Sequence, residues 1–142
     1  MGSIADVNVI LPLLVGAHPA HAAALAWFDE QPGGSVGWHL LTRLGVLRLL
    51  CNSRVMAADV LAPDAALDVW DRLVVNRRFV EIARLPAAHE SALRRLVAGR
   101  APTPNLWTDA WLAALAQCLG REFVTFDRGF RSFAGVPTRI LG

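Results

Sequence analysis

Short apolar segments alternate along this chain with longer segments of helical periodicity. Turn-forming residues separate them, with proline- and glycine-containing breaks at residues 31–34, 62–63, 99–104 and 134–137. Brief apolar runs are typical of buried strands, whereas apolar residues spaced three and four apart indicate helices. Strands that alternate with helices predict an α/β fold, in which a mostly parallel sheet is covered by helices on both faces.

The boundaries of the expected elements follow from these breaks. The expected strands are Ser3–Val9, Ser35–Trp38, Phe79–Ala83, Glu122–Phe126 and Pro137–Leu141. The expected helices are Pro19–Glu30, Leu40–Leu50, Asp64–Asn76, Ala87–Ala98 and Pro104–Leu119. We expect Asp64 and Thr103 to be helix N-caps, and Gly120 to end the last of these helices.

Length and composition fit one globular domain. The chain has 142 residues, of which 54% are hydrophobic and 18% charged, so a disordered chain is excluded as the main interpretation. Each apolar run falls short of the ~18 residues that a membrane helix needs, so we expect no membrane partner. Cys51 and Cys118 form no CxxC pair, so we expect reduced thiols in a cytoplasmic protein.

The two halves of the chain carry opposite charge. Residues 1–71 contain three arginines and seven acids, whereas residues 72–142 contain eleven arginines and five acids, with no lysine in either half. An arginine-rich half is compatible with a nucleic-acid partner, because guanidinium groups match the geometry of phosphates. It is equally compatible with the codon usage of a GC-rich genome, so charge alone leaves the partner open.

Three aspartates lie in segments that are otherwise apolar. Asp6 lies in or at the end of the first expected strand, and Asp127 directly follows the apolar strand 123–126. Asp109 is the only charged residue in the helical stretch 106–119, and its neighbours at +3, +4 and +7 are apolar. Burying an isolated carboxylate is costly, so each of these side chains needs a compensating partner.

Together, the three aspartates predict a metal site. At one sheet edge their carboxylates would repel and raise one another's pKa values, and Mg²⁺ or Mn²⁺ would relieve that conflict because both ions prefer oxygen ligands. Sites in open α/β sheets form outside the carboxyl ends of the strands, where these residues are expected. Three short polar residues accompany the acids and are expected to support them: Asn8, Asn105 and Thr125. The alternative is that each aspartate caps a helix, closes a turn or pairs with an arginine.

The segments that contain these aspartates resemble the PIN-domain nucleases, and most closely the VapC toxins of VapBC toxin–antitoxin pairs. The segments are IADVNV at 4–9, NLWTDAWLAALA at 105–116 and FVTFDRGF at 123–130. In addition, TRLGVLRLL at 42–50 resembles the T-x-x-G-x-L-R helix of one VapC branch. Because the motifs span nearly the whole chain in family order, the resemblance implies a single PIN-like domain over residues 1–142, with a three-layer α/β/α sandwich.

The resemblance also implies a function. It implies a metal-dependent endoribonuclease that is the toxin of a type II toxin–antitoxin system, is held in check by a VapB-type antitoxin, and forms a homodimer. Asp6, Asp109 and Asp127 match the family's acids and would be catalytic Mg²⁺ or Mn²⁺ ligands in RNA hydrolysis. Asn8 and Thr125 match polar residues that support the site.

The chain departs from the family pattern at one position. Many relatives carry an acid immediately after the threonine of the helix motif, where this chain has Arg43, and there is no acid between Glu30 and Asp59. Two interpretations follow: Arg43 contacts the scissile phosphate of an active enzyme, or the chain is a catalytically weak PIN-like module that binds RNA or the antitoxin. Arg128 and Arg131 are further candidate contacts to RNA phosphates.

Overall fold

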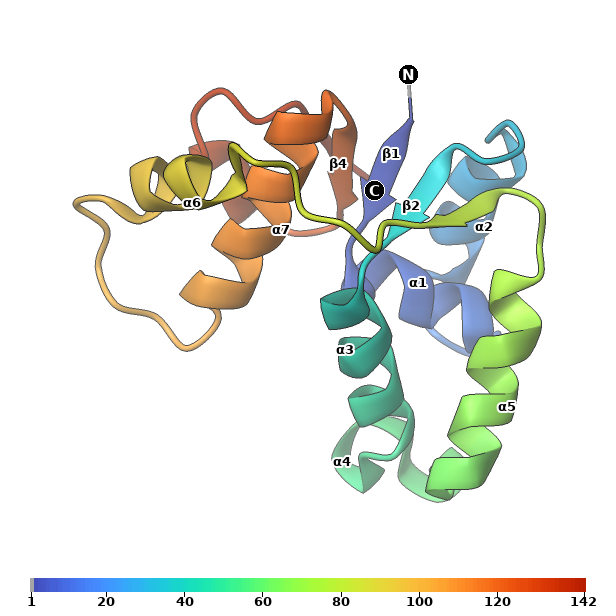
Figure 1. Cartoon of the computed structure of the whole chain (residues 1–142). Helices are drawn as coiled ribbons and strands as arrows, with labels where there is room; N and C mark the ends of the chain where they lie inside the picture. Colours follow the sequence, from blue (N-terminus) through green and yellow to red (C-terminus); the bar gives the residue numbers. More distant parts are fainter. Residues whose placement is uncertain (1) are drawn as a thin grey trace.

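The computed structural model describes residues 2–142, which contain one five-stranded sheet (Figure 1). The strand order is β3-β2-β1-β4-β5, and all four pairings are parallel. The strands are β1 (Ser3–Ala5), β2 (Val36–Trp38), β3 (Phe79–Glu81), β4 (Glu122–Thr125) and β5 (Thr138–Ile140). The expected parallel α/β fold is confirmed.

Helices connect the strands in this part of the chain. The α-helices are α1 (Val7–Leu14), α2 (His21–Asp29), α3 (Leu40–Leu50), α4 (Ser53–Met56), α5 (Pro63–Val74), α6 (His89–Val97) and α7 (Leu106–Leu119). Two short 3₁₀ helices are η1 (Ala57–Asp59) and η2 (Arg128–Ser132). The helix expected at 40–50 has the predicted boundaries, whereas α1, α4 and the 3₁₀ helices are additional.

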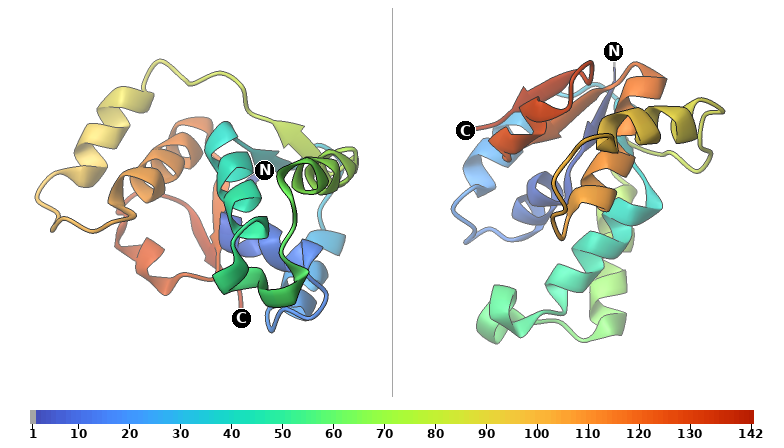
Figure 2. Two further views of the ribbon diagram at one scale, coloured as in Figure 1. Left: turned by 90° about the horizontal axis from the view of Figure 1, so that it is seen from below. Right: turned by 90° about the vertical axis from the view of Figure 1, so that its left-hand side faces the viewer.

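The sheet separates two hydrophobic cores, which gives the expected three layers (Figures 1 and 2). On one face, α6 and α7 pack over Ile4 of β1 and Phe123 of β4. On the other face, α1, α2, α3 and α5 pack over Ala5, Val36 and Val124. Successive residues of a strand point to opposite faces, so β1 and β4 contribute to both cores.

The first expected strand is too long, because a helix begins within it. Strand β1 ends at Ala5, and Asp6 is the N-cap of α1: its Oδ1 accepts a hydrogen bond from the backbone N–H of Val7 at 2.7 Å. The apolar run that follows is buried helix rather than strand, and Pro12 lies inside it. A short apolar run does not distinguish these two structures by its periodicity.

One of the three expected caps is confirmed. Gly120 ends α7 in the left-handed conformation, with φ of 62°. The N-cap of α5 is Ala62, and the helix begins at Pro63. Asp64 therefore lies inside the first turn of the helix and not at its cap. The N-cap of α7 is Asn105 rather than Thr103, so this helix begins two residues later than predicted.

The order of the strands places a topological switch between β1 and β4. From β1 the chain adds β2 and then β3 on one side, whereas β4 and β5 lie on the other side. Ligands of open α/β sheets bind in the crevice at such a switch, outside the carboxyl ends of the strands. Asp6 directly follows β1 and Asp127 lies two residues after β4, so the topology brings both to that crevice.

The cysteines and the lengths of the helices complete the description of the fold. Cys51 is exposed, Cys118 is partly buried, and both are free thiols. Of the helices in residues 2–142, none combines the length and the apolar character that crossing a bilayer demands.

Candidate active site

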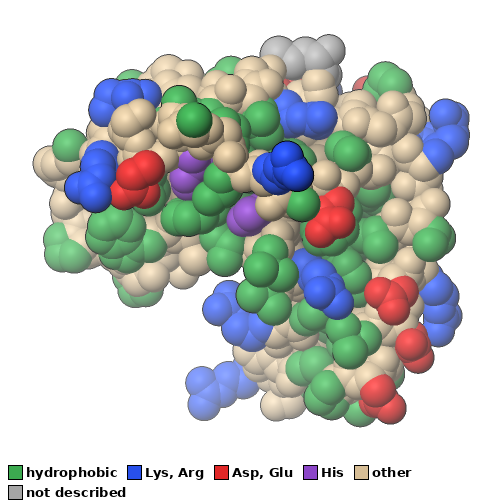
Figure 3. All heavy atoms as spheres, in the orientation of Figure 1, with side chains coloured by type: hydrophobic (Ala, Val, Ile, Leu, Met, Phe, Trp, Pro, Cys, Tyr) green, Lys and Arg blue, Asp and Glu red, His purple; other side chains and the backbone are tan. Residues whose placement is uncertain are grey.

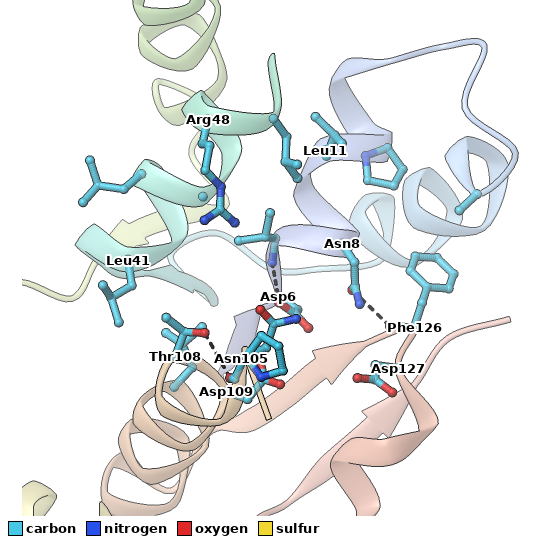
Figure 4. Close-up of a pocket in the computed structure, with 18 of the residues that line it drawn as sticks. Asp6, Asn8, Leu11, Leu41, Arg48, Asn105, Thr108, Asp109, Phe126 and Asp127 are labelled. Atoms are coloured by element: carbon cyan, nitrogen blue, oxygen red, sulfur yellow. Dashed lines mark hydrogen bonds between the residues drawn. The ribbon is translucent and has the colours of Figure 1, made fainter. Parts of the chain in front are cut away.

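A pocket of about 620 Å³ opens at the carboxyl edge of the sheet (Figure 4). Its volume lies within the range of small-ligand sites. Its walls come from the ends of β1 and β4, from α1 and α3, and from the first turn of α7. Asp6, Asp109 and Asp127 all line it, so the fold gathers three acids that are far apart in the sequence.

Asp6 is held in place by two hydrogen bonds. One oxygen caps α1 through Val7, and the other accepts a hydrogen bond from the Thr125 hydroxyl at 2.8 Å. Burial is the largest influence on Asp6 and raises its pKa, and the charge of Asp127 raises the pKa as well. The hydrogen bonds from Thr125 and Val7 act in the opposite direction. The carboxyl group is therefore fixed in position while its negative charge is disfavoured.

Thr125 joins the ends of the two central strands. It is fully buried, and its Oγ1 accepts hydrogen bonds from the Asn8 side-chain amide at 3.1 Å and from the Asp127 backbone N–H at 3.0 Å. The Asn8 carbonyl oxygen in turn accepts a hydrogen bond from the Phe126 backbone N–H at 3.1 Å. This network fixes the segment after β4 against α1, and it links Thr125 to Asp6 and Asp127 and Asn8 to Thr125.

Asp127 begins η2, much as Asp6 begins α1. Its Oδ1 accepts a hydrogen bond from the Gly129 backbone N–H at 2.8 Å, and its side chain is exposed at the pocket. Asp6 and Asp127 therefore do act as helix caps, as the alternative interpretation proposed. Each cap uses only one carboxylate oxygen, so capping is compatible with a metal site. Arg128 and Arg131 lie in η2 and are exposed beside Asp127.

Asp109 enters the pocket from the first turn of α7. Asn105 lies one helical turn earlier and also lines the pocket. Burial, followed by the negative charges of Asp6 and Asp127, raises the pKa of Asp109 to about 6. The side chain is only partly buried, so solvent moderates the associated energy. The three carboxyl groups are thus close enough to sense one another's charge.

Arginine does not neutralise these acids. Within residues 2–142, the one salt bridge closer than 4.0 Å joins Glu90 and Arg94 on the exposed side of α6. The alternative in which each aspartate pairs with its own guanidinium is therefore wrong. The pocket concentrates negative charge, which a divalent cation would relieve.

The donor set has the chemistry that Mg²⁺ or Mn²⁺ requires, although it does not form a closed cage. Within residues 2–142, no three His, Cys, Asp or Glu side chains are arranged as a ready-made metal site. Mutual repulsion disfavours close approach of three carboxylates without a cation. Mg²⁺ keeps several of its waters when it binds to proteins, so its ligands need not all converge beforehand. The three aspartates therefore fit a hydrated dication.

The arginine in the pocket wall is Arg48, and not Arg43. The residues of α3 that line the pocket are Leu41, Leu44, Gly45, Arg48 and Leu49. They recur every three or four positions and so share one face of the helix. Arg43 lies off that face, so its expected placement beside the carboxylates is corrected. Figure 4 shows the side chain of Arg48 directed from α3 towards the acids.

His18 is a second pocket residue for which the sequence predicted no role in a site. It lies between α1 and α2, where its Nδ1 accepts a hydrogen bond from the Ala20 backbone N–H at 3.0 Å. That bond places the ring proton of a neutral imidazole on Nε2. His18 lies among turn residues, so no helical or strand periodicity indicated that its side chain faces the pocket.

Comparison with known proteins identifies the family. The family described as the PIN domain matches residues 4–136, which include all three aspartates. This chain is a PIN domain. Among curated relatives, Ribonuclease VapC41 of Mycobacterium tuberculosis is 31% identical over 142 residues, covering 97% of each chain. Ribonuclease VapC33 of the same organism is 27% identical over 133 residues, covering 92% of each. The PIN domain described here thus belongs with the VapC proteins.

Solved structures show that this PIN domain has the fold of VapC proteins. VapBC2 from Rickettsia felis, bound to a DNA fragment from its promoter, matches with a TM-score of 0.70 and 11% identity over all of both chains. VapC20 of Mycobacterium tuberculosis, a Sarcin-Ricin loop cleaving toxin, matches with a TM-score of 0.68 and 18% identity, covering 96% of this chain and 99% of that one. The expected PIN-like sandwich is confirmed.

Proposed function

We propose that this PIN domain is an endoribonuclease that hydrolyses RNA phosphodiester bonds with Mg²⁺ or Mn²⁺ held by Asp6, Asp109 and Asp127. The observation that supports it is the convergence of three carboxylates, none paired with an arginine, on one pocket at the topological switch. A dication bound there would supply an activated water nucleophile and Lewis-acid stabilisation of the phosphate charge. The names of the relatives, which are ribonucleases, support the choice of RNA.

The chain's own residues would divide the work between binding and positioning. Asp6 is the most constrained ligand, because Val7 and Thr125 hold its two oxygens. Thr125 and Asn8 would keep that geometry as the substrate binds, since groups that orient ligands tune metal affinity by ~10–100-fold. Asn105 would support Asp109 from one turn earlier in α7. Arg128 and Arg131, exposed beside Asp127, would contact RNA phosphates.

The same proposal includes a partner. Two of the similar structures are VapBC complexes with DNA, from Rickettsia felis and Salmonella typhimurium, which supports a type II toxin role in which a VapB-type antitoxin restrains the nuclease. Such an antitoxin would lay an amphipathic helix on an apolar groove and place an arginine in the acidic pocket. Leu40 and Leu44 on α3 and Leu67 on α5 are exposed by 52%, 51% and 40%, and Figure 3 shows apolar side chains on the surface over these two helices. We also expect a homodimer.

An RNA cleavage assay tests the proposed function. The purified chain is incubated with structured RNAs and Mn²⁺ or Mg²⁺, beside Asp6→Asn and beside the same mixture with EDTA. Cleavage by the wild type that both the variant and the chelator abolish supports the proposal, because a contaminating nuclease would not respond to Asp6. Equal inactivity of wild type and variant would overturn it and favour the module that only binds RNA or the antitoxin.

A further inference from the structure

Arg48 occupies an unusual electrostatic position in the pocket wall. It lies in the last turn of α3, its side chain is exposed to the pocket, and three carboxylates line the same cavity. Even so, in the part of the chain from 2 to 142, the single salt bridge lies elsewhere, on α6. A guanidinium near carboxylates ordinarily forms a close bidentate pair. Here a gap separates the cation from the acids (Figure 4).

Close packing of α3 against α1 brings the backbone of α3 near the first acid. A Cβ atom on Gly45 would lie 2.7 Å from Cγ2 of Val7, the residue that directly follows Asp6. Glycine therefore lets the two helices approach beside the first acid. Arg48 follows Gly45 by three residues and so lies on the same face of α3. Backbone packing thus determines where Arg48 begins relative to the acids, and no ion pair closer than 4.0 Å joins its guanidinium to them.

A gap bounded by carboxylates on one side and a guanidinium on the other suits a phosphodiester. A dication on the acids would attract one side of the phosphate, and the guanidinium fork matches the oxygens on the other. Leu41, Leu44 and Leu49 line the pocket around Arg48, and an apolar surrounding strengthens a charged hydrogen bond.

We propose that Arg48 binds a non-bridging phosphate oxygen of the RNA substrate from the α3 wall of the pocket. The proposal rests on the proposed ribonuclease function for the identity of the ligand. It assigns to Arg48 the phosphate contact that one interpretation of the sequence had given to Arg43. It also requires the fork of arginine, so lysine at this position restores the charge but not the full affinity.

RNA binding without cleavage tests this assignment. Binding of a fluorescent single-stranded RNA is measured by anisotropy in EDTA, at several salt concentrations, for wild type, Arg48→Gln, Arg48→Lys and Arg43→Gln. The last variant is the matched control, because it removes the same charge from the same helix away from the pocket. Arg48→Gln should weaken binding about tenfold and reduce the salt slope by about 0.7, the value for one lost phosphate contact on a single strand. Arg43→Gln should stay within about twofold of wild type, and Arg48→Lys should fall between.

The outcomes separate this proposal from the proposed function. Equal affinities and salt slopes for Arg48→Gln and Arg43→Gln would overturn the role of Arg48, even if the wild type cleaves RNA. Failure of the wild type to bind RNA in EDTA would overturn the role of Arg48, whereas the nuclease proposal would still be decided by the cleavage assay with metal. Arg48-dependent binding by a chain that cleaves nothing would support the phosphate contact and overturn the nuclease. Thermal melting of each variant shows whether it is folded, and the exposed position of Arg48 predicts unchanged melting.

Discussion

The two sides of the pocket are constructed in different ways. On the strand side, Asp6, Asn8 and Thr125 are joined by hydrogen bonds of 2.8–3.1 Å that also fix the backbone after β4. On the helix side, Asp109 and Arg48 are placed by the packing of α7 and α3, and they are partly or fully exposed to the pocket. The strand side is thus a preorganised polar network, whereas the helix side holds opposite charges that no ion pair joins.

This difference predicts how each side of the pocket responds to the loss of a hydrogen bond or a charge. The network around Asp6 supplies hydrogen bonds that partly offset the burial of its charge. For Asp109, burial and the negative charges of Asp6 and Asp127 all raise the pKa. Loss of the network should therefore lower the stability of the fold, whereas loss of the Asp109 charge should increase it.

Thr125→Val is expected to have the largest effect, because it removes the centre of the strand-side network. Valine has nearly the same shape, yet it removes the hydroxyl that donates to Asp6 and accepts from the Asn8 amide, which costs about 1–3 kcal/mol of unfolding free energy. Chemical denaturation measures this loss, and RNA cleavage should fall ~10–100-fold. The control is Thr138→Val on β5, where the hydroxyl bonds only to the Val136 carbonyl. Equal stability of the two variants would show that the network is not preorganising the site.

Asp109→Asn is expected to stabilise the chain while it weakens metal binding. The pKa of Asp109 is raised from 3.8 to about 6 in the folded state, so its stabilising protonated form is present at low pH and is lost as the pH rises through 6. Partial exposure reduces the cost of the charged form to roughly 1 kcal/mol near neutral pH. Denaturation at about pH 7.5 should show that gain, and the gain should shrink towards pH 4. Asp68→Asn, exposed on α5, is the control, and a gain of the same size there would contradict the account.

Gly45→Ala tests whether the close packing of α3 against α1 determines the position of α3 in the pocket wall. Alanine favours a helix by about 1 kcal/mol over glycine, but its Cβ would meet Val7 at 2.7 Å, and such overpacking costs about 1–3 kcal/mol. We expect a net loss near 1 kcal/mol and weaker RNA binding, as Arg48 moves with the helix. The double variant Gly45→Ala/Val7→Ala should bind RNA better than Gly45→Ala alone. A more stable single variant with normal binding would show that the contact is not limiting.

Arg128→Gln and Arg131→Gln are expected to have the smallest effects. Both side chains are exposed in η2, where single charge contacts contribute about 0.2–1 kcal/mol. RNA affinity should therefore fall less than about fivefold for either variant. A loss as large as that of Arg48→Gln would place the main phosphate contact beside Asp127 rather than on α3.

The sequence predicted the parallel sheet and the convergence of three aspartates at its edge, because both depend on strong local signals. Short apolar strands separated by turn residues fix the parallel α/β fold, and a lone carboxylate in an apolar segment identifies Asp6, Asp109 and Asp127. The helix after Asp6 was missed because its apolar residues have no distinguishing period. Its N-cap hydrogen bond to Val7 is visible only in three dimensions.

The sequence also did not determine which face of α3 is turned towards the pocket. Leucines occur around the whole of this helix, so its apolar pattern defines no single face. Packing decides instead: Thr42, Val46 and Leu50 are buried, which turns Arg48 rather than Arg43 towards the pocket. A motif gives the spacing of residues along a helix, whereas the neighbouring elements determine which of them reaches the site.

Calorimetric titration with Mn²⁺ at about pH 7.5 is the most direct test of the central claim that the three aspartates hold a divalent cation. The account predicts saturable binding by the wild type, weakened more than ~10-fold in Asp109→Asn and unchanged in Arg43→Gln. A wild-type chain that takes up no Mn²⁺, or an Asp109→Asn variant that binds it as tightly as the wild type, would contradict the account.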